Sequence, residues 1–214
     1  MTTLITGANR GIGRAMFDAF RDRGEAVTGT HRDAPAADML RLDVADPGSV
    51  AQLARDRGDT PLDLLVCNAG VYPDKGIALE DLTADLWAQA FAVNVTGVFL
   101  TIRALLPNVK AAGGKIAIIS SQMASDTRAP GGSYIYRASK AAVLNLGRNL
   151  ATDLKGDGVA VGIYHPGWVQ TDMGGSGASI TPEAAAQGLL ARFDELSLAT
   201  TGCFRTWDGQ DHPY

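Results

Sequence analysis

Thr6-Gly7-Ala8-Asn9-Arg10-Gly11-Ile12-Gly13 is a glycine-rich turn between an apolar run, Thr3–Thr6, and an amphipathic segment, Ile12–Arg23. Glycine lets a backbone turn sharply and approach a ligand, and the N-terminus of a following helix presents free N–H groups. A strand, a glycine turn and a helix in this order predict a phosphate site at the start of an α/β fold. Taken alone, the spacing G-x-x-x-G-x-G is also compatible with an ordinary tight loop.

The alternation of strand-like and helix-like segments continues to the end of the chain, which favours a mostly parallel sheet with helices on both faces. Further strands are expected at Ala26–Thr30, Met39–Leu42, Leu62–Cys67, Lys115–Ser120, Val159–Tyr164 and Gly202–Thr206. Further helices are expected at Ser49–Arg57, Ala84–Val93 with a continuation to Ala111, Tyr136–Leu154 and Pro182–Glu195. Only ten residues, Asp33–Leu42, are available for the second crossover, so its usual helix should be lost or shortened.

The amino-acid composition limits the classes of protein to which this chain could belong. The 214 residues are 46% hydrophobic with a net charge of -4, which predicts one domain, residues 1–214, and no nucleic-acid surface. No apolar run long enough for a membrane span and no basic leader is expected, which indicates a cytoplasmic protein. Cys67 and Cys203 are interpreted as reduced thiols, and the three histidines share no ligand spacing, so no metal site is expected. The polar tail Asp208–Tyr214 is expected at the surface.

Tyr136 and Lys140 are four residues apart in a helix-like segment, so their side chains share one helix face. An adjacent ammonium favours the phenolate and should lower the pKa of Tyr136 toward neutrality, giving an acid/base unit. Tyr134 has no such partner, because Ala138 lies four residues further on. Chance pairing on a solvated helix face is the alternative interpretation.

Six motifs together resemble the short-chain dehydrogenase/reductase family, non-extended type. They are Thr6–Gly13, Asn68-Ala69-Gly70, Asn94, Ser120-Ser121, Tyr136-x-x-x-Lys140, and Pro166-Gly167 through Thr171. The branch that includes C-factor proteins and sniffer-type carbonyl reductases is indicated by residues 132–140, 165–175 and 207–209. The resemblance implies a doubly wound Rossmann-type fold of about seven strands in the order 3-2-1-4-5-6-7, with the site at their carboxyl ends. It also implies a homo-oligomer.

The resemblance implies a nicotinamide cofactor site. Asp43 and Val44 would contact the adenine, Asn68, Ala69 and Gly70 the adenosine ribose, and Pro166, Gly167, Val169 and Thr171 the nicotinamide. The phosphates would lie on the turn that contains Gly7, Asn9, Arg10, Gly11, Ile12 and Gly13.

The end of the second strand discriminates between the two cofactors. An acidic side chain there would bind the ribose 2′-hydroxyl of NAD, whereas an arginine accommodates the 2′-phosphate of NADP. This chain has His31 and Arg32, with Asp33 expected to point away and Arg10 as a second cation on the same side. NADP(H) is therefore predicted over NAD(H), although both arginines could also be solvated surface charges.

Tyr136 would then be the general acid/base, with Lys140 holding its pKa down and Asn94 positioning a water in the proton relay. Ser121 would polarise the substrate carbonyl. It lies fifteen residues before Tyr136, and a strict family count would reach Met123, so the two extra residues are assigned to the loop. Ser120 and Ser125 stay open as substitutes.

The predicted function is oxidoreduction of a small carbonyl or alcohol substrate, with substrate loops at residues 122–133 and 172–180. The second loop is short and glycine-rich and is expected to form an open or poorly ordered lid. An NAD(P)-binding signalling protein of the C-factor type is the alternative. A nucleotide-sugar epimerase is excluded by the short chain and by the glycine spacing.

Overall fold

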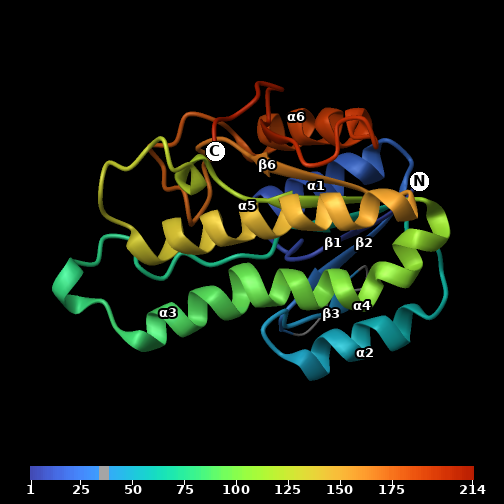
Figure 1. The fold of residues 1–214 in the computed structure, drawn as a ribbon, viewed down its shortest axis with the longest axis horizontal. Coiled ribbons are helices and arrows are strands. Elements are labelled where there is room, and N and C mark those ends of the chain that lie inside the picture. Colours follow the sequence, from blue (N-terminus) through green and yellow to red (C-terminus); the bar gives the residue numbers. More distant parts are fainter. Residues whose placement is uncertain (34–38) are drawn as a thin grey trace.

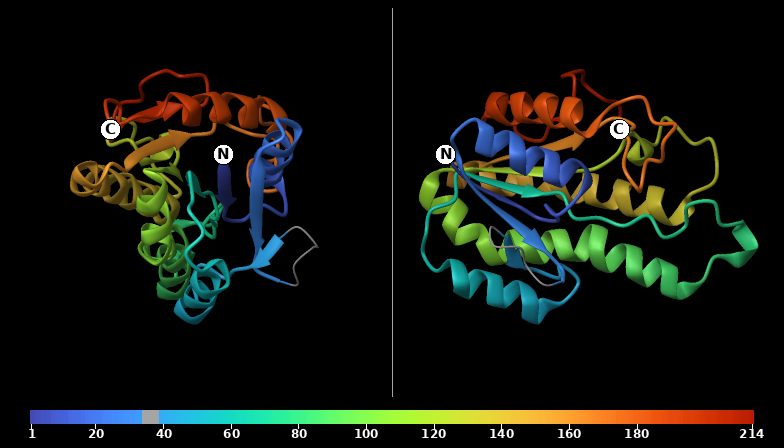
Figure 2. Two further views of the ribbon diagram at one scale, coloured as in Figure 1. Left: turned by 90° about the vertical axis from the view of Figure 1, so that its right-hand side faces the viewer. Right: turned by 180° about the vertical axis from the view of Figure 1, so that it is seen from behind.

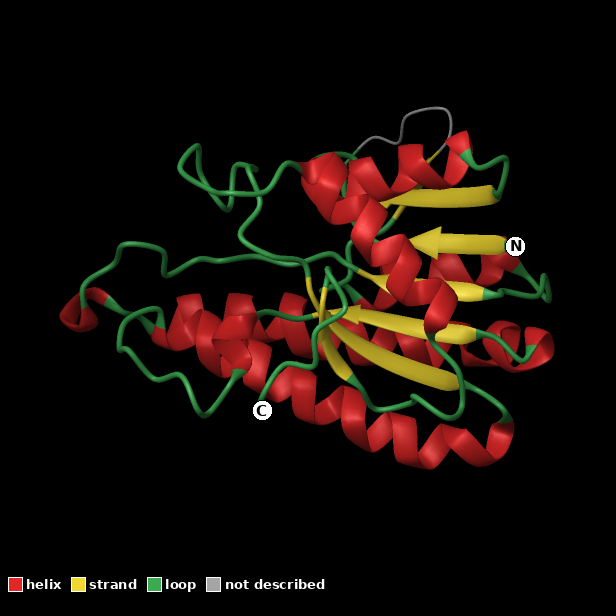
Figure 3. Ribbon diagram, turned by 90° about the horizontal axis from the view of Figure 1, so that it is seen from above, coloured by secondary structure: helices red, strands yellow, loops and turns green. Residues whose placement is uncertain are grey.

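The computed structural model describes residues 1–33 and 39–214. Its sheet has seven strands, in the order β3-β2-β1-β4-β5-β6-β7, and every pairing between named strands is parallel. All strands therefore point the same way, toward the side where the long loops lie (Figure 3). The predicted fold and strand order are confirmed. The strands are β1 Thr2–Ile5, β2 Ala26–His31, β3 Met39–Arg41, β4 Leu64–Cys67, β5 Lys115–Ile119, β6 Ala160–His165 and β7 Phe204–Thr206.

Helices cover both faces of the sheet (Figures 1 and 2). The helices are α1 Gly11–Asp22, α2 Pro47–Arg57, α3 Ala84–Phe91, α4 Gly97–Ala112, α5 Tyr134–Leu154 and α6 Pro182–Glu195. α1 and α6 bury an aromatic layer that includes Phe17, Phe20 and Phe193 against one face. The aliphatic faces of α2, α4 and α5 pack on the other face. Burial on both faces explains why the strands are almost uniformly apolar.

Helix α1 begins one residue earlier than predicted, and α2 and α5 each begin two residues earlier because of a cap. The Asp46 side chain accepts a hydrogen bond from Gly48 N, and Pro47 occupies the first turn of α2. α5 begins at Tyr134, two residues before the predicted start, because a carboxylate from another loop accepts its first N–H groups. The shortened crossover predicted for 33–42 lies partly outside the described residues.

Most of the C-terminal tail lies at the surface as predicted, with His212 as the buried exception. His212 is buried and packs on the Phe204 ring at 4.8 Å between centroids. Tyr214 O accepts a hydrogen bond of 3.3 Å from Thr127 N in the loop before α5. The end of the tail therefore contacts the loop at residues 122–133.

The helical stretch Ala84–Ala112 has a window of mean hydropathy 1.6 and, by length and composition alone, could cross a membrane. The sequence-based expectation of no such stretch was therefore too strict. The inner face of α4, with Ile102, Leu105 and Val109, is buried in the core beside β4 and β5. Core helices pass the same test, so the stretch is weak evidence for a membrane span.

Candidate active site

The glycine turn and the end of β4 form one unit. Asn68 Nδ2 donates 3.0 Å hydrogen bonds to both Thr6 O and Gly7 O, and Thr6 Oγ1 accepts from Asn68 N and Ala69 N. Gly7 has a φ of +66° and lies against Ala69, while Gly13 is so close to Gly7 O that a Cβ would be 2.2 Å away. Two predicted motifs are thus in direct contact at the carboxyl ends of β1 and β4.

The N-terminus of α1 fits a phosphate. Arg10 is its N-cap, with extended backbone and no side-chain cap hydrogen bond, and the first turn carries no acidic residue. The first N–H groups of a helix have no intrahelical acceptors and lie at the positive end of its dipole. The N–H groups of Gly11, Ile12 and Gly13 are therefore available to an anion.

The segment after β6 completes this side of the site. Thr171 Cγ2 lies 3.2 Å from the position of a Cβ on Gly11, so the segment 166–171 faces the glycine turn. Gly167 has a φ of +90°, and Val169 is buried and forms a bridge with Ile180. Thr171 Oγ1 accepts a hydrogen bond from Gly174 N at 3.1 Å.

The lid at residues 172–180 is well tied down, in contrast to the prediction of an open or poorly ordered segment. Arg10 Nη1 pairs with Asp172 Oδ2 at 2.8 Å. Lys75 Nζ donates to Met173 O at 2.7 Å, and Trp168 Nε1 donates to Gly174 O at 3.0 Å. The glycines of the lid permit tight turns, and the C=O groups of Met173 and Gly174 accept hydrogen bonds from side chains outside the lid.

Asn94 is buried in a π-helical turn, Ala92–Thr96, between α3 and α4. Its Oδ1 accepts from Val71 N at 2.8 Å, and its Nδ2 donates to Val71 O and Ser139 Oγ at 2.9 and 3.0 Å. A Cβ on Gly70 would be 3.3 Å from Asn94 Oδ1 and 3.6 Å from Lys140 Nζ. The structure therefore brings Asn94, Gly70 and Lys140 together.

Tyr136 and Lys140 are both buried on the inner face of α5, and Lys140 Nζ lies 5.6 Å from the centre of the Tyr136 ring. The pKa of Tyr136 is raised rather than lowered, because burial penalises the phenolate. Burial also lowers the pKa of Lys140 to about 8, and its ammonium donates to Ile119 O at 2.9 Å. The expectation that Lys140 brings the pKa of Tyr136 down toward neutrality is therefore wrong for this structure, since the desolvation of the phenol dominates.

Ser121 is the serine that the structure places beside the phenol, where a hydrogen-bonding interaction lowers the pKa of Tyr136 against the effect of burial. Ser121 Oγ also accepts a hydrogen bond of 3.1 Å from Met123 N, which leaves its hydroxyl hydrogen free to donate. The hydroxyls of the two substitutes are bonded to other groups. Ser120 Oγ donates to Lys140 O at 3.0 Å, and Ser125 Oγ bonds Thr127 Oγ1 at 2.8 Å. The loop before α5 thus accommodates the two extra residues and leaves Ser121 facing Tyr136.

Two residues beside Tyr136 escaped the sequence analysis. The Tyr72 ring stacks on the Tyr136 ring, with centroids 4.1 Å apart and planes 19° from parallel. Asp74 is buried beneath the first turn of α5. No pattern in the sequence marks either residue, because both lie in the irregular loop after β4, more than sixty residues before their contacts.

The predicted adenine-contacting residues lie beside a pocket at another edge of the sheet. Arg32, Arg41 and Asp43 line one pocket at the carboxyl ends of β2 and β3, where His31 and Arg41 are partners in register. Asp33 does not point away as predicted: its carboxylate lies 3.8 Å from His31 Nε2 and 3.7 Å from Arg32 Nε. Asp43 Oδ1 accepts from Ala45 N at 2.9 Å, and Val44 is buried.

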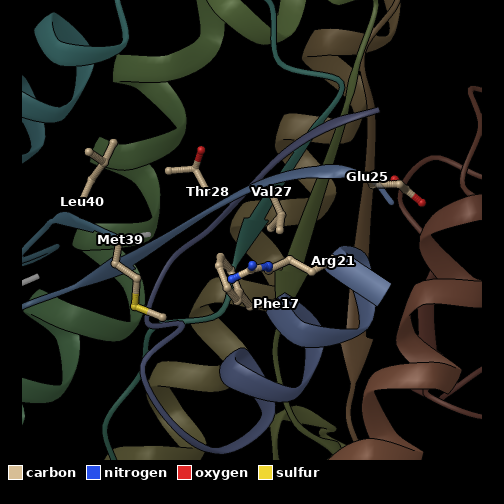
Figure 4. A pocket seen from close by; sticks show the side chains of 7 residues that line it. All are labelled: Phe17, Arg21, Glu25, Val27, Thr28, Met39 and Leu40. Carbon is tan, nitrogen blue, oxygen red and sulfur yellow. The ribbon is translucent and has the colours of Figure 1, made fainter. Parts of the chain in front are cut away.

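A second pocket lies between α1 and the β2–β3 edge, and none of the predicted site residues lines it (Figure 4). It is near the C-terminal end of α1, away from the carboxyl ends of the strands. In residues 1–33 and 39–214, no group of three or more His, Cys, Asp or Glu side chains has the arrangement of a metal site.

Comparison with known proteins gives consistent matches. Residues 1–179 match the family model described as short chain dehydrogenase. The 1-hydroxy-2-glutathionyl-2-methyl-3-butene dehydrogenase of Rhodococcus sp. (strain AD45) is 35% identical, covering 97% of each chain. The C-signal protein of Myxococcus xanthus is 36% identical over 72% of this chain and 93% of its own.

Two solved structures extend the match to the whole fold. The NADPH-bound carbonyl reductase from chicken fatty liver has a TM-score of 0.89 at 27% identity, covering 100% of this chain and 98% of its own. Carbonyl reductase Sniffer of D. melanogaster has a TM-score of 0.92 at 25% identity, covering 100% and 99%.

Proposed function

This chain belongs to the short-chain dehydrogenase/reductase family of oxidoreductases, and on that basis we propose that it transfers a hydride between NADP(H) and a small carbonyl or alcohol substrate. The family resemblance predicted from six motifs is thereby confirmed. One observation carries the proposal. Tyr136, Lys140 and Ser121 converge at the carboxyl ends of the strands, beside a helix N-terminus that fits a phosphate.

A nicotinamide bound there would supply the hydride, and the residues of this chain would handle the proton and the charge. Ser121 would donate a hydrogen bond to the substrate oxygen, where negative charge develops. Tyr136 would give its proton to the same oxygen. Burial raises its pKa, so the phenol is protonated at neutral pH, as a proton donor must be. Lys140 would stabilise the phenolate that is left, and Asn94 would hold the loop after β4 in place.

For the cofactor, Gly11, Ile12 and Gly13 would bind the pyrophosphate through their N–H groups. Arg32 and Asp43 would bind the adenosine end, because both line the same pocket. Arg32 is the cation that supports NADP(H), because it lines this pocket, which Arg10 does not. Both arginines lie beside a carboxylate, Arg10 at 2.8 Å from Asp172 and Arg32 at 3.7 Å from Asp33. The NADPH-bound carbonyl reductase among the structural neighbours is consistent with this preference.

The catalytic test is oxidation of NADPH against a panel of aldehydes and ketones by wild type, Tyr136→Phe and Ser121→Ala. Tyr136→Phe should abolish most turnover, and Ser121→Ala should lower kcat about 10²-fold, the usual cost of one oxyanion donor. The control is Phe91→Leu, at the end of α3, which should fold and show the same turnover as wild type. Full turnover by Tyr136→Phe would overturn the assignment of the acid.

The cofactor test compares NADPH and NADH. Loss of a charge-assisted hydrogen bond costs about 1.5–3 kcal/mol, so Arg32→Ala should raise KM for NADPH about tenfold or more and leave that for NADH unchanged. Arg103→Ala, an exposed arginine on α4, is the control. A wild type that prefers NADH would contradict the proposed specificity.

A regulatory role is the second candidate, favoured by the 36% identity to the C-signal protein. Tight NADPH binding without turnover of any carbonyl would support it over the enzymatic role. We also infer a homo-oligomer, because Trp87 and Phe99 expose aromatic surface on α3 and α4. A monomeric mass in light scattering at micromolar concentration would contradict that inference.

A further inference from the structure

The Asp74 carboxylate lies at the start of the helix that carries Tyr136. Only 1% of Asp74 is exposed. Its Oδ2 accepts a hydrogen bond of 2.8 Å from Ile135 N, and its Oδ1 accepts one of 3.1 Å from Tyr136 N. Both oxygens of one buried carboxylate are thus bonded to consecutive backbone groups, one of which belongs to Tyr136 itself.

The helix lacks a cap of its own at this end. Ser133, the residue before the first turn, has a φ of +51° and makes no side-chain cap hydrogen bond. Its hydroxyl is bonded instead to the Tyr72 hydroxyl. The first N–H groups of a helix need acceptors, and here two of them find one only because the loop after β4 brings Asp74 beneath the turn.

The negative charge of Asp74 is compensated by backbone N–H groups and by the dipole of α5. No ion pair joins Asp74 to an arginine, lysine or histidine in residues 1–33 and 39–214, so its compensation comes from N–H groups and from the positive end of a 21-residue helix. An uncompensated buried carboxylate would be costly. If α5 or the loop after β4 moved alone, the Asp74 carboxylate would lose these partners, so the two segments are expected to stay together.

The same loop also holds the Tyr136 ring. Tyr72 stacks on it at 4.1 Å, and Val71 is clamped through both its N–H and its C=O by Asn94. The loop residues Val71, Tyr72 and Asp74 thus connect the π-helical turn to the ring and to the backbone of Tyr136.

We propose that Asp74 is a positioning residue for Tyr136, which fixes the backbone of the first turn of α5 so that the phenol stands beside Ser121 and Lys140. The proposal rests on the proposed function of Tyr136 as the acid. A carboxylate bonded to the backbone of an acid does not touch the substrate. It acts by setting where the phenol lies, and misplacement of a reacting group by about 1 Å can cost up to 10²-fold in rate.

The first test measures kcat, NADPH affinity and unfolding for Asp74→Ala and for a matched control, Asn108→Ala. Asn108 is also a buried polar side chain with two hydrogen bonds to backbone carbonyls, of 2.7 and 2.9 Å, but it lies at the opposite end of the sheet. Both variants should lose stability. Only Asp74→Ala should lose kcat, by about 10- to 100-fold, with NADPH affinity within about twofold of wild type. Equal kcat in the two variants would overturn the proposal.

The second test separates positioning from general damage. In a Tyr136→Phe background, Asp74→Ala should lower the residual turnover no further, because the group through which it acts is gone. A multiplicative loss would assign Asp74 a structural role alone. Asp74→Asn keeps the shape and one acceptor oxygen, so it should fold if Asp74→Ala does not and recover part of kcat. If Asp74→Asn were as active as wild type, the carboxylate would not be needed to position Tyr136, and that part of the proposal would be overturned.

A third readout does not depend on activity. Amide hydrogen exchange at Ile135 and Tyr136 should be slow in wild type and fast in Asp74→Ala, and Asn108→Ala should leave it slow. Unchanged protection would overturn the proposed contact. If wild type reduces no carbonyl, the proposed function fails while this exchange result still stands or falls by itself.

Discussion

Replacement of Lys140 by methionine should make the protein more stable and inactive. Lys140 is 5% exposed, and burial lowers the pKa of its ammonium from 10.5 to about 8. At about 1.36 kcal/mol per pKa unit, holding the ammonium in the folded protein at pH 7 costs about 3 kcal/mol. Loss of the hydrogen bond to Ile119 O costs about 1 kcal/mol. Lys140→Met should therefore raise the free energy of unfolding at pH 7 by about 2 kcal/mol.

The gain should vanish at alkaline pH. Because the folded-state pKa lies below the unfolded-state value, the unfolded chain binds more protons than the folded one between pH 8 and 10.5. The stability of wild type therefore rises with pH through this window, relative to the variant. Near pH 10 the penalty has fallen to below about 1 kcal/mol, and the two proteins should be about equally stable.

Urea unfolding without cofactor, at pH 7 and pH 10, measures both quantities. The difference between the two proteins cancels contributions from Cys67 and Tyr136, whose pKa values in the unfolded chain fall in the same range. Lys155→Met, an exposed lysine just after α5, is the control and should show no pH-dependent difference. A Lys140→Met difference that is equal at pH 7 and pH 10 would refute the reasoning, because the lysine would then not be desolvated.

Three further outcomes are expected. Gly13→Ala should abolish NADPH binding and destabilise the fold by at least about 1–3 kcal/mol, because its Cβ would be 2.2 Å from Gly7 O and 2.5 Å from Asn68 Nδ2. Urea unfolding would measure the loss of stability and a fluorescence titration the loss of binding. Normal NADPH binding by the variant would contradict this prediction. The Cys67 thiol should resist a disulfide reagent in the folded protein at pH 8, since it is buried and its pKa is raised to about 12; rapid labelling without denaturant would contradict this. Asp172→Asn should change stability by less than about 1 kcal/mol, because both partners of its ion pair with Arg10 are exposed; a larger shift in a urea titration would show that the lid is held mainly by this pair.

Local patterns in the sequence were enough for the class of fold. The apolar runs, the glycine turn at Gly7 to Gly13 and the alternation of strands and helices are local features, and together they predict a mostly parallel sheet with helices on both faces. The strand order came from the family resemblance, and the structure confirms it. Helix starts were less accurate where the cap is not local, as at Tyr134, because the capping carboxylate lies sixty residues upstream.

The features of the candidate site also divide into those that the sequence could predict and those that it could not. Tyr136, Lys140, Asn94 and Asn68 could be chosen by spacing and resemblance, because each lies in a helical segment or, for Asn68, directly after a strand. The pKa of Tyr136 could not be predicted in this way. The spacing of Tyr136 and Lys140 along the helix does not show how much water the fold removes from the phenol, and burial raises the pKa where a lowered pKa was expected. The same limit applies to Arg10, whose partner Asp172 is known only once the lid has folded back over the turn.

By itself, then, the sequence determined the order of elements, the glycine turn and the choice of Tyr136 and Lys140 as the proposed acid and its partner, because these depend on periodicity and on residue type. The tertiary structure decided which serine lies beside Tyr136, how burial shifts the pKa values of Tyr136 and Lys140, and that Tyr72 and Asp74 contact Tyr136. Those outcomes depend on desolvation and on contacts between loops distant along the chain, and neither has a local signature in the sequence.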